Sequence, residues 1–461
     1  MTRFSKTLRL AAALAVLGPV AACDTLDELL VANNPERISE DALNDALLVD
    51  VLANSVIGEF SAMYDDPFIW RGSMFTDEQI TGINWESTAR LSQRLVRFDE
   101  GDPDNMFSQI SAARVMADSA AGRFRTLIDN AGADERMAIA LIYAGYSHII
   151  LGDAMCEAVF NVGETIASQA QIYERGLSRF EEGMQVAGAA GRQDLVNLAR
   201  TGLARTHLNL GNHSQVMQYA GEVPADFVHW VEYEQTSDGG TDLVLWGRIN
   251  GGNHSLGVHP NFLNGDFGTQ DIVSGQTDPR VQHTTSWSLG HNRLTRLYKP
   301  YQSLPFSGYN GEAIADGGQP PFYQRGTDIK MASGLEAMHH YYEAAGPGGM
   351  GPAGSTLDFV NARRAAGKQA PVDLSGSDLM AELRDQRGRD MYMGGFRLGD
   401  LRRWKNQGAG DFFPSGTHPT TEWGSYGDAT CFPLPLEEYE GNPNLTPGTA
   451  KRPPIFSTTW T

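Results

Sequence analysis

The sequence lacks the short motifs by which several enzyme classes are recognised. It contains no HExxH, no GxSxG, no GxxxxGK followed by Ser or Thr, and no CxxC. These absences exclude the zinc site, the nucleophile elbow, the phosphate loop and the redox pair that such motifs form. A pair of catalytic carboxylates has no local signature, so a glycoside hydrolase stays open as an alternative.

Basic residues are also few. The chain has 36 Lys and Arg against 56 Asp and Glu, and its formal net charge is −20. The first 22 residues carry three basic side chains and no acidic one, so the side-chain charge without them is −23. Such a charge argues against a nucleic-acid partner and against a strongly polyanionic ligand.

The N-terminus has the features of an export signal. Arg3, Lys6 and Arg9 precede an apolar run that ends in small residues, and residues 20–23 read VAAC. This ending resembles a bacterial lipobox, in which the cysteine, here Cys23, is acylated and becomes the new N-terminus. Ordinary signal cleavage beside an incidental cysteine is the alternative. We expect a signal peptide over 1–22, a lipidated tether over 23–37, and no other run long enough to span a membrane.

Cysteine is almost absent from the rest of the chain. With Cys23 lipidated, only Cys156 and Cys431 remain. In an exported protein an even remainder predicts a disulfide between them, and two buried free thiols are the alternative.

Helical periodicity dominates the first half. Ser39, followed by two acidic residues, is a candidate N-cap for a long helix. Leu48, Leu52, Val56 and Phe60 recur every four residues in this helix, and Val51 is expected to fill the same core stripe.

Four helices are predicted between about residues 105 and 221, arranged as two hairpins. Aligning Leu151 with Leu210 also brings His148 onto His207, an offset of 59 residues. This similarity indicates a degenerate repeat of the tetratricopeptide kind, whose regular unit is about 34 residues, with a loop inserted at 161–168. The expected fold class is mainly α, with tetratricopeptide-like helical hairpins and long irregular decorating loops.

The expected domain is divided by differences in composition and helical periodicity along the chain. Residues 38–461 are expected to form one domain, with a helical scaffold over about 38–221 and 328–405, a loop-rich segment over about 222–327, and an extended C-terminal segment over 406–461. The GPGGMG stretch at 346–351 follows a predicted helix rather than a strand, so it is interpreted as a turn. His339 and Glu343 share a helix face without a nearby third ligand, which favours hydrogen bonding over a metal site.

Aromatic residues give the positive signal for a ligand. Trp70 and Trp85 flank a polar stretch that contains Asp77, and Trp287, Tyr301 and Tyr309 lie in the loop-rich segment. A sugar requires flat aromatic faces beside hydrogen-bonding groups, so these six residues are the candidate ligand-binding residues. Anchoring of long loops to the scaffold is the alternative role for each aromatic residue.

The C-terminal third contains two recognisable motifs. LRDQRGRDMYMGGFRLGDLRRWKNQG (383–408) and CFPLPLEEYEGNPNL (431–445) resemble the C-terminal signature of the SusD/RagB family of outer-membrane nutrient-binding lipoproteins. Gln386, Asp390 and Gly394 depart from that signature. Arg397 and Leu401 share one helix face, as do Asp400 and Trp404, so we expect an internal clasp of arginines and carboxylates with Trp404 packed inward.

The resemblance implies a non-enzymatic protein without a cofactor. It also implies a glycan or similar nutrient as ligand, a TonB-dependent transporter barrel as partner, and a lipid-anchored position on the outer membrane facing the cell surface. The alternatives are a membrane-anchored glycoside hydrolase and a helical-repeat assembly factor.

Overall fold

The computed structural model describes residues 42–235, 242–250, 255–263, 278–284, 286–302 and 323–445. Residues 1–48 and 49–461 form separate compact units. Cys23, Ser39 and Tyr309 lie outside the described residues. The described part of the first unit consists of two 3-10 turns, η1 (Ala42–Asn44) and η2 (Ala46–Leu48). Asp45 separates them by accepting the backbone N–H of Leu47 at 2.9 Å.

The first long helix of the second unit is α3 (Val49–Met63). Leu52, Val56 and Phe60 are buried along one face, as the periodicity predicts. The prediction is wrong for Leu48, which ends the 3-10 turn η2 before this helix and is half-buried, and for Val51, which is 52% exposed. Val51 precedes Leu52 by one position, which places it about 100° around the helix and outside the core stripe.

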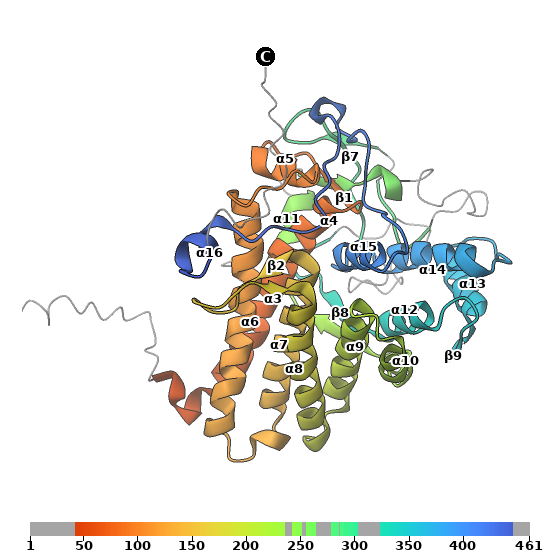
Figure 1. Cartoon of the computed structure of the whole chain (residues 1–461). Coiled ribbons are helices and arrows are strands. Elements are labelled where there is room, and N and C mark those ends of the chain that lie inside the picture. Colours follow the sequence, from red (N-terminus) through yellow and green to blue (C-terminus); the bar gives the residue numbers. More distant parts are fainter. Residues whose placement is uncertain are drawn as a thin grey trace, which may run out of the picture. The chain divides into compact units, whose positions relative to one another are not determined.

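Five helices, not four, follow, and the first four of them form an antiparallel stack (Figure 1). They are α6 (Gly101–Leu127), α7 (Glu135–Ala154), α8 (Gln169–Ala189), α9 (Gln193–Asn209) and the additional α10 (His213–Gly221). Neighbours in sequence pack against each other, which confirms the predicted hairpins. Phe180 of α8 fills the space that small residues leave on both sides: a Cβ on Gly145 would lie 2.8 Å from its ring, and one on Gly202 2.4 Å.

Two helical stretches, Ala46–Phe75 and Glu135–Ala154, match a membrane-spanning helix in length and composition. The second stretch is α7, which packs between α6 and α8 and is 94% buried over its most apolar window. It is therefore a core helix. In the first stretch the helical geometry is interrupted at Asp66 within η3 (Tyr64–Ile69), before α4 (Trp70–Phe75) begins.

The expected helix from residue 328 begins later than predicted. Residues Ile329–Ser333 form β8, which pairs antiparallel with β4 (Val228–Val231) from the loop-rich segment. Helix α12 (Gly334–Ala345) then starts where the Ser333 hydroxyl accepts the Glu336 backbone N–H at 3.2 Å. The strand forms because a distant segment supplies its hydrogen-bonding partner. The sequence around residues 329–333 contains no pattern that identifies this partner.

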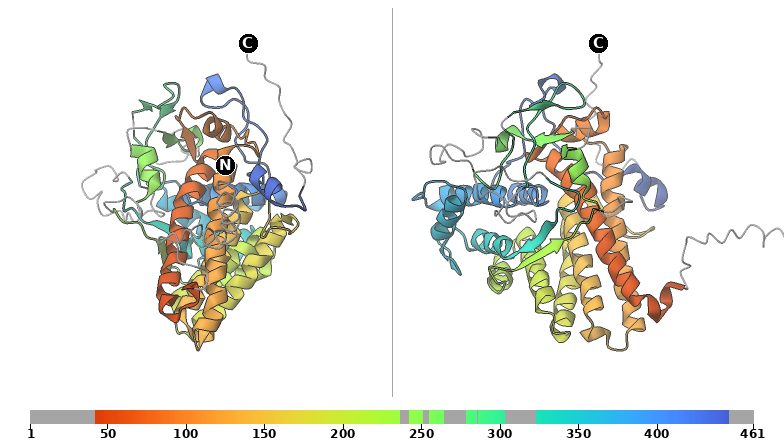
Figure 2. Two further views of the ribbon diagram at one scale, coloured as in Figure 1. Left: turned by 90° about the vertical axis from the view of Figure 1, so that its left-hand side faces the viewer. Right: turned by 180° about the vertical axis from the view of Figure 1, so that it is seen from behind.

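Short elements from distant parts of the chain gather at one end of the helical stack (Figures 1 and 2). They are β1 (Gln79–Thr81), α5 (Glu86–Ser92), α11 (Val244–Asn250), β5 (Leu256–Val258), η5 (Pro260–Phe262), β6 (Ser288–Leu289) and β7 (Arg296–Leu297), together with α4. Strand β1 pairs with β5, and β6 pairs with β7. The short hairpin β2 (Glu157–Ala158) and β3 (Ala167–Ser168) contains the inserted loop predicted between α7 and α8.

The C-terminal part returns to helices and then becomes irregular. The GPGGMG stretch is a turn that leads into the hairpin β9 (Met350–Gly351) and β10 (Gly354–Ser355). Helices α13 (Thr356–Ala366), α14 (Gly376–Asp390) and α15 (Arg397–Asn406) follow. The described part of the last segment, up to residue 445, contains the short helices η8 (Thr421–Trp423) and α16 (Leu436–Gly441).

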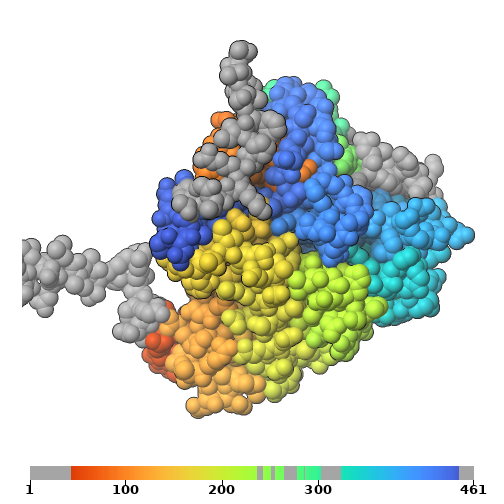
Figure 3. Space-filling model, in the orientation of Figure 1, coloured from red at the N-terminus to blue at the C-terminus, as the bar shows by residue number. Residues whose placement is uncertain are grey.

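A disulfide between Cys156 and Cys431 fixes this last segment to the end of α7. Their Cα atoms lie 5.1 Å apart. Backbone hydrogen bonds flank the bridge, from Cys156 N–H to Phe432 C=O at 2.8 Å and from Phe432 N–H to Ala154 C=O at 2.9 Å. In the space-filling view the blue C-terminal segment lies against the yellow surface of the β2–β3 region (Figure 3).

Candidate functional site

The basic cluster of α14 and α15 is buried and joins several elements. We call Arg387, Arg397, Arg402 and Arg403, with the groups that they contact, the arginine clasp. Asp400 accepts Arg387 Nε at 2.7 Å and Arg403 Nη1 at 2.8 Å. Arg402 Nη1 donates to three backbone carbonyls at the end of α7, those of Gly152, Asp153 and Met155. These contacts confirm the predicted internal clasp of arginines and carboxylates.

The other members of the predicted clasp are also buried. The Trp404 ring is 3% exposed, and its Nε1 donates to Glu343 Oε1 at 2.8 Å. Glu343 also pairs with Arg403, at 3.0 Å. His339 Nε2 lies 2.7 Å from Asp390 Oδ2. His339 and Glu343 therefore have separate hydrogen-bonding partners, and the described residues contain no group of metal-ligating side chains.

Asp77 belongs to the arginine clasp. Its carboxylate receives Arg397 Nε at 2.7 Å and Nη2 at 2.8 Å, and its side chain is buried. Burial alone would raise the pKa of Asp77, but Arg397 holds it below its ordinary value. Asp77 was predicted to bind ligand, but in the structure it fixes the segment before β1 to α15.

Glu78, the next residue, is buried without a cation bonded to it. Its Oε1 accepts the Met393 backbone N–H at 2.8 Å, and its backbone C=O accepts the Tyr392 hydroxyl at 3.2 Å. Burial raises the pKa of Glu78 from 4.5 to about 8, against the lowering effect of the Met393 hydrogen bond. The carboxyl group therefore takes up a proton on folding at neutral pH.

Two glycines allow the irregular segment after β1 to pack closely against the β6–β7 hairpin. A Cβ on Gly82 would lie 2.6 Å from Gly290 Cα, and the Gly82 C=O accepts the Asn292 N–H at 2.8 Å. Trp85 follows Gly82 by three residues, and Trp287 precedes Gly290 by three. Both rings face solvent, with Trp85 51% and Trp287 44% exposed. The close crossing therefore holds two exposed indoles on one end of the unit.

Trp70 differs from these two tryptophans, because it is 1% exposed. The Arg71 guanidinium lies 4.3 Å and the Arg248 guanidinium 3.8 Å from its ring centroid. Arg248 also lies 5.6 Å from the centroid of Trp85. The buried Trp70 ring therefore packs against the Arg248 guanidinium and has no face open to solvent. Tyr301, another predicted ligand residue, is half-buried, and its backbone N–H donates to the Gln282 C=O at 3.0 Å.

Arg248 is a candidate residue that the sequence analysis missed. It lies on α11, whose first N–H groups, those of Val244 and Leu245, donate to the buried carboxyl of Asp65. Burial, followed by the neighbouring Asp66, raises the pKa of Asp65 to about 8. Arg296 contacts Trp287 in the same manner, with its guanidinium 4.7 Å from the ring centroid. We call Trp85, Trp287, Arg248 and Arg296 the tryptophan face.

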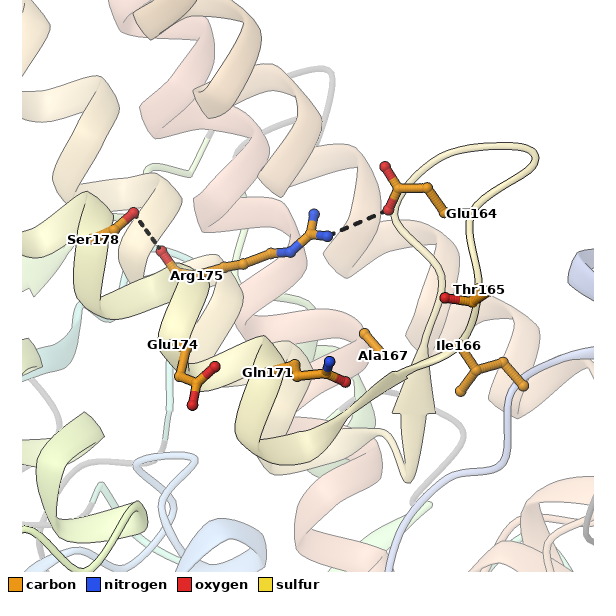
Figure 4. Close-up of a pocket in the computed structure, with 8 residues that line it drawn as sticks. All are labelled: Glu164, Thr165, Ile166, Ala167, Gln171, Glu174, Arg175 and Ser178. Carbon is orange, nitrogen blue, oxygen red and sulfur yellow. Dashed lines mark hydrogen bonds and ion pairs between the residues drawn. The ribbon is translucent and has the colours of Figure 1, made fainter.

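Two hollows of the surface lie elsewhere. A groove of about 700 Å³ lies between the loop before β3 and helix α8, where Arg175 reaches to within 3.3 Å of Glu164 (Figure 4). A groove of about 460 Å³ runs beside α14, with Asp77, Arg397 and Trp404 in its lining. Neither groove is lined by Trp85 or Trp287. Because a sugar ring stacks on an open aromatic face, the tryptophan face is the better candidate for a glycan.

Comparison with known proteins identifies the fold. No sequence-family model and no curated protein matches the chain. A SusD superfamily protein from Parabacteroides distasonis superposes with a TM-score of 0.62 at 15% identity, over 89% of this chain and 99% of that one. Surface glycan-binding protein A from Bacteroides fluxus gives 0.60 at 14% identity, over 91% and 100%. A SusD-like carbohydrate binding protein from Bacteroides fragilis gives 0.60 at 13%, over 87% and 99%.

These likenesses show that the chain has the SusD fold along most of its length. The mainly helical architecture, with tetratricopeptide-like hairpins and long loops, is confirmed. The resemblance carried by residues 383–408 and 431–445 is likewise confirmed at the level of the fold.

Removing the acidic centre of the arginine clasp is expected to destabilise the protein strongly. Asp400→Ala leaves Arg387 buried without its carboxylate, which costs about 3–5 kcal/mol of unfolding free energy. Asp411→Ala is the matched control, because Asp411 pairs with Lys405 on the surface and such pairs contribute about 0–1 kcal/mol. Urea denaturation measures both, and equal losses would contradict a structural clasp.

Because of Glu78, the free energy of unfolding is expected to fall as the pH rises. Its raised pKa means that the folded state binds more protons than the unfolded state between pH 4.5 and about 8, so rising pH destabilises the fold in this window. Glu78→Gln removes this dependence. Thermal melts should therefore show that the substitution raises the melting temperature relative to wild type more at pH 8 than at pH 5.

The control for this experiment is Glu86→Gln, because the Glu86 side chain is 84% exposed. The same change in melting temperature at both pH values for Glu78→Gln would contradict the proton uptake.

Proposed function

We propose that this protein is a non-enzymatic binding protein that holds an oligosaccharide on the tryptophan face. The observation that carries the proposal is the pair of exposed indoles, Trp85 and Trp287, fixed on one end of the unit by the Gly82–Gly290 crossing. A pyranose ring places its apolar C–H face on an indole and directs its hydroxyl groups to polar neighbours. The rigid backbone beneath the two indoles reduces the entropy lost on binding.

The structural neighbours support this ligand class. Those from Bacteroides fluxus and Bacteroides fragilis are named as glycan-binding and carbohydrate-binding proteins. The carboxylates Asp66 and Glu86 near Trp85 are ion-paired with Arg71 and Arg90. A carboxylate held in an ion pair is a poor general acid, because the cation favours its ionised form, so Asp66 and Glu86 favour a binding role over hydrolysis.

Delivery to a TonB-dependent transporter is the second part of the proposal. We propose that acylation of Cys23 anchors the protein to the outer membrane, facing the cell surface, and that the captured glycan passes to a transporter barrel. The lipobox-like VAAC and the SusD fold support this arrangement. Residues 23–37 would tether the folded part to the lipid.

Alanine variants test the ligand site. Trp85→Ala and Trp287→Ala should each weaken glycan binding at least about ten-fold, or about 1.4 kcal/mol, because the stacking surface is lost. Phe412→Ala is the matched control, since Phe412 is 40% exposed and lines the groove beside α14. Isothermal titration against glycans selected on an array gives the affinities, and circular dichroism verifies folding. Wild-type affinity in both tryptophan variants would refute the site, and release of shorter products would refute the non-enzymatic role.

The partner is tested on the full lipidated chain. We expect a TonB-dependent barrel to copurify in stoichiometric amount from gently solubilised membranes, identified by mass spectrometry. A Cys23→Ala chain, which cannot be acylated at that position, is the control for membrane association. Absence of any barrel after crosslinking would contradict the transport role. The glycan proposal would not be affected, because the titrations test it separately.

A further inference from the structure

Two segments that contribute to the tryptophan face carry basic residues and no acidic ones. The chain contains 56 acidic residues, yet none occurs between Asp278 and Glu312. This stretch includes Arg293, Arg296 and Lys299. Residues 243–265, which contain Arg248, also lack acidic residues. These two segments therefore carry positive charge within a chain whose formal net charge is −20.

The guanidinium of Arg248 lies beside an indole with its hydrogen-bonding capacity unused. Its contact with a carboxylate is a 3.8 Å approach to Asp66, which pairs more closely with Arg71. Its Nε is buried and has no hydrogen-bond partner in the described part of the chain. The Arg248 side chain is 24% exposed, so its terminal nitrogens are the donors that an incoming acceptor can reach.

Arg296 repeats this arrangement on the β6–β7 hairpin. Its side chain is exposed and lies over the Trp287 ring, and it forms no ion pair among the residues that the structure describes. Each exposed tryptophan thus has one guanidinium at its ring. An indole and a guanidinium together match one chemical unit, a sugar ring that carries a carboxylate.

We propose that the ligand is an acidic oligosaccharide, in which uronic-acid rings stack on Trp85 and Trp287 and their carboxylates pair with Arg248 and Arg296. This inference rests on the proposed function of the tryptophan face. The −20 charge of the chain repels long polyanions, so short oligosaccharides with a few carboxylates are the preferred ligands. A planar guanidinium donates two parallel hydrogen bonds to a carboxylate, which gives selectivity over a neutral sugar.

The test compares sugars that differ only in charge. Tri-galacturonic acid and aldotetrauronic acid are titrated against the mature protein beside their methyl-esterified and carboxyl-reduced forms. We expect at least about ten-fold tighter binding of one of the free acids than of its neutral form. Arg248→Gln and Arg296→Gln should each remove most of this preference, measured as the ratio of the affinities for the free acid and for its neutral form in the same variant.

Arg293→Gln is the matched control, because Arg293 lies on the same hairpin, is exposed and has no tryptophan contact in the described structure. It should retain the preference for the acid. Equal affinity for acidic and neutral forms, with binding still dependent on Trp85 and Trp287, would overturn the acidic ligand and leave the proposed function intact. Failure of every acidic and neutral glycan to bind would overturn both.

Discussion

The bidentate ion pair between Arg397 and Asp77 determines where the exposed end of the molecule lies. Arg397 begins α15, which the other clasp arginines hold against the end of α7 and against Glu343 of α12. Asp77 stands two residues before β1, so the pair fixes the start of the segment that runs through Gly82 to Trp85. A buried pair is a weak source of net stability, but its loss is costly, so it specifies one position for β1. The tryptophan face is therefore positioned from the core of the helical stack.

The same end of the molecule combines a rigid base with an open surface. Asp65 caps α11 and so positions Arg248, while the Gly82–Gly290 crossing positions Trp287 relative to Trp85. None of these supports touches solvent to a large extent, whereas the two indoles do. Preorganisation of this kind suits capture of a flexible ligand, because the protein loses little conformational entropy on binding.

Local patterns in the sequence predicted the elements whose partners lie nearby. The hairpins of α6–α9 follow from helical periodicity and small residues, and Phe180 between Gly145 and Gly202 shows why those residues are small. The clasp followed from the spacing of Arg397, Asp400 and Trp404, and the disulfide from the count of cysteines. Strand β8 was missed because its partner β4 lies about a hundred residues away. Trp70 and Trp85 look alike in sequence, but the burial of Trp70 depends on Arg248 from another segment, which no local pattern reveals.

The central claim is that the face formed by Trp85 and Trp287 holds a sugar, and a crystal structure of the complex tests it most directly. Crystals of residues 38–461 would be grown with the tightest-binding oligosaccharide from the titrations. The account predicts electron density for a sugar ring stacked on the exposed side of Trp85 or Trp287, with its polar groups toward Arg248 or Arg296. Density for the sugar in the groove beside α8 or beside α14, with both indoles bare, would contradict it.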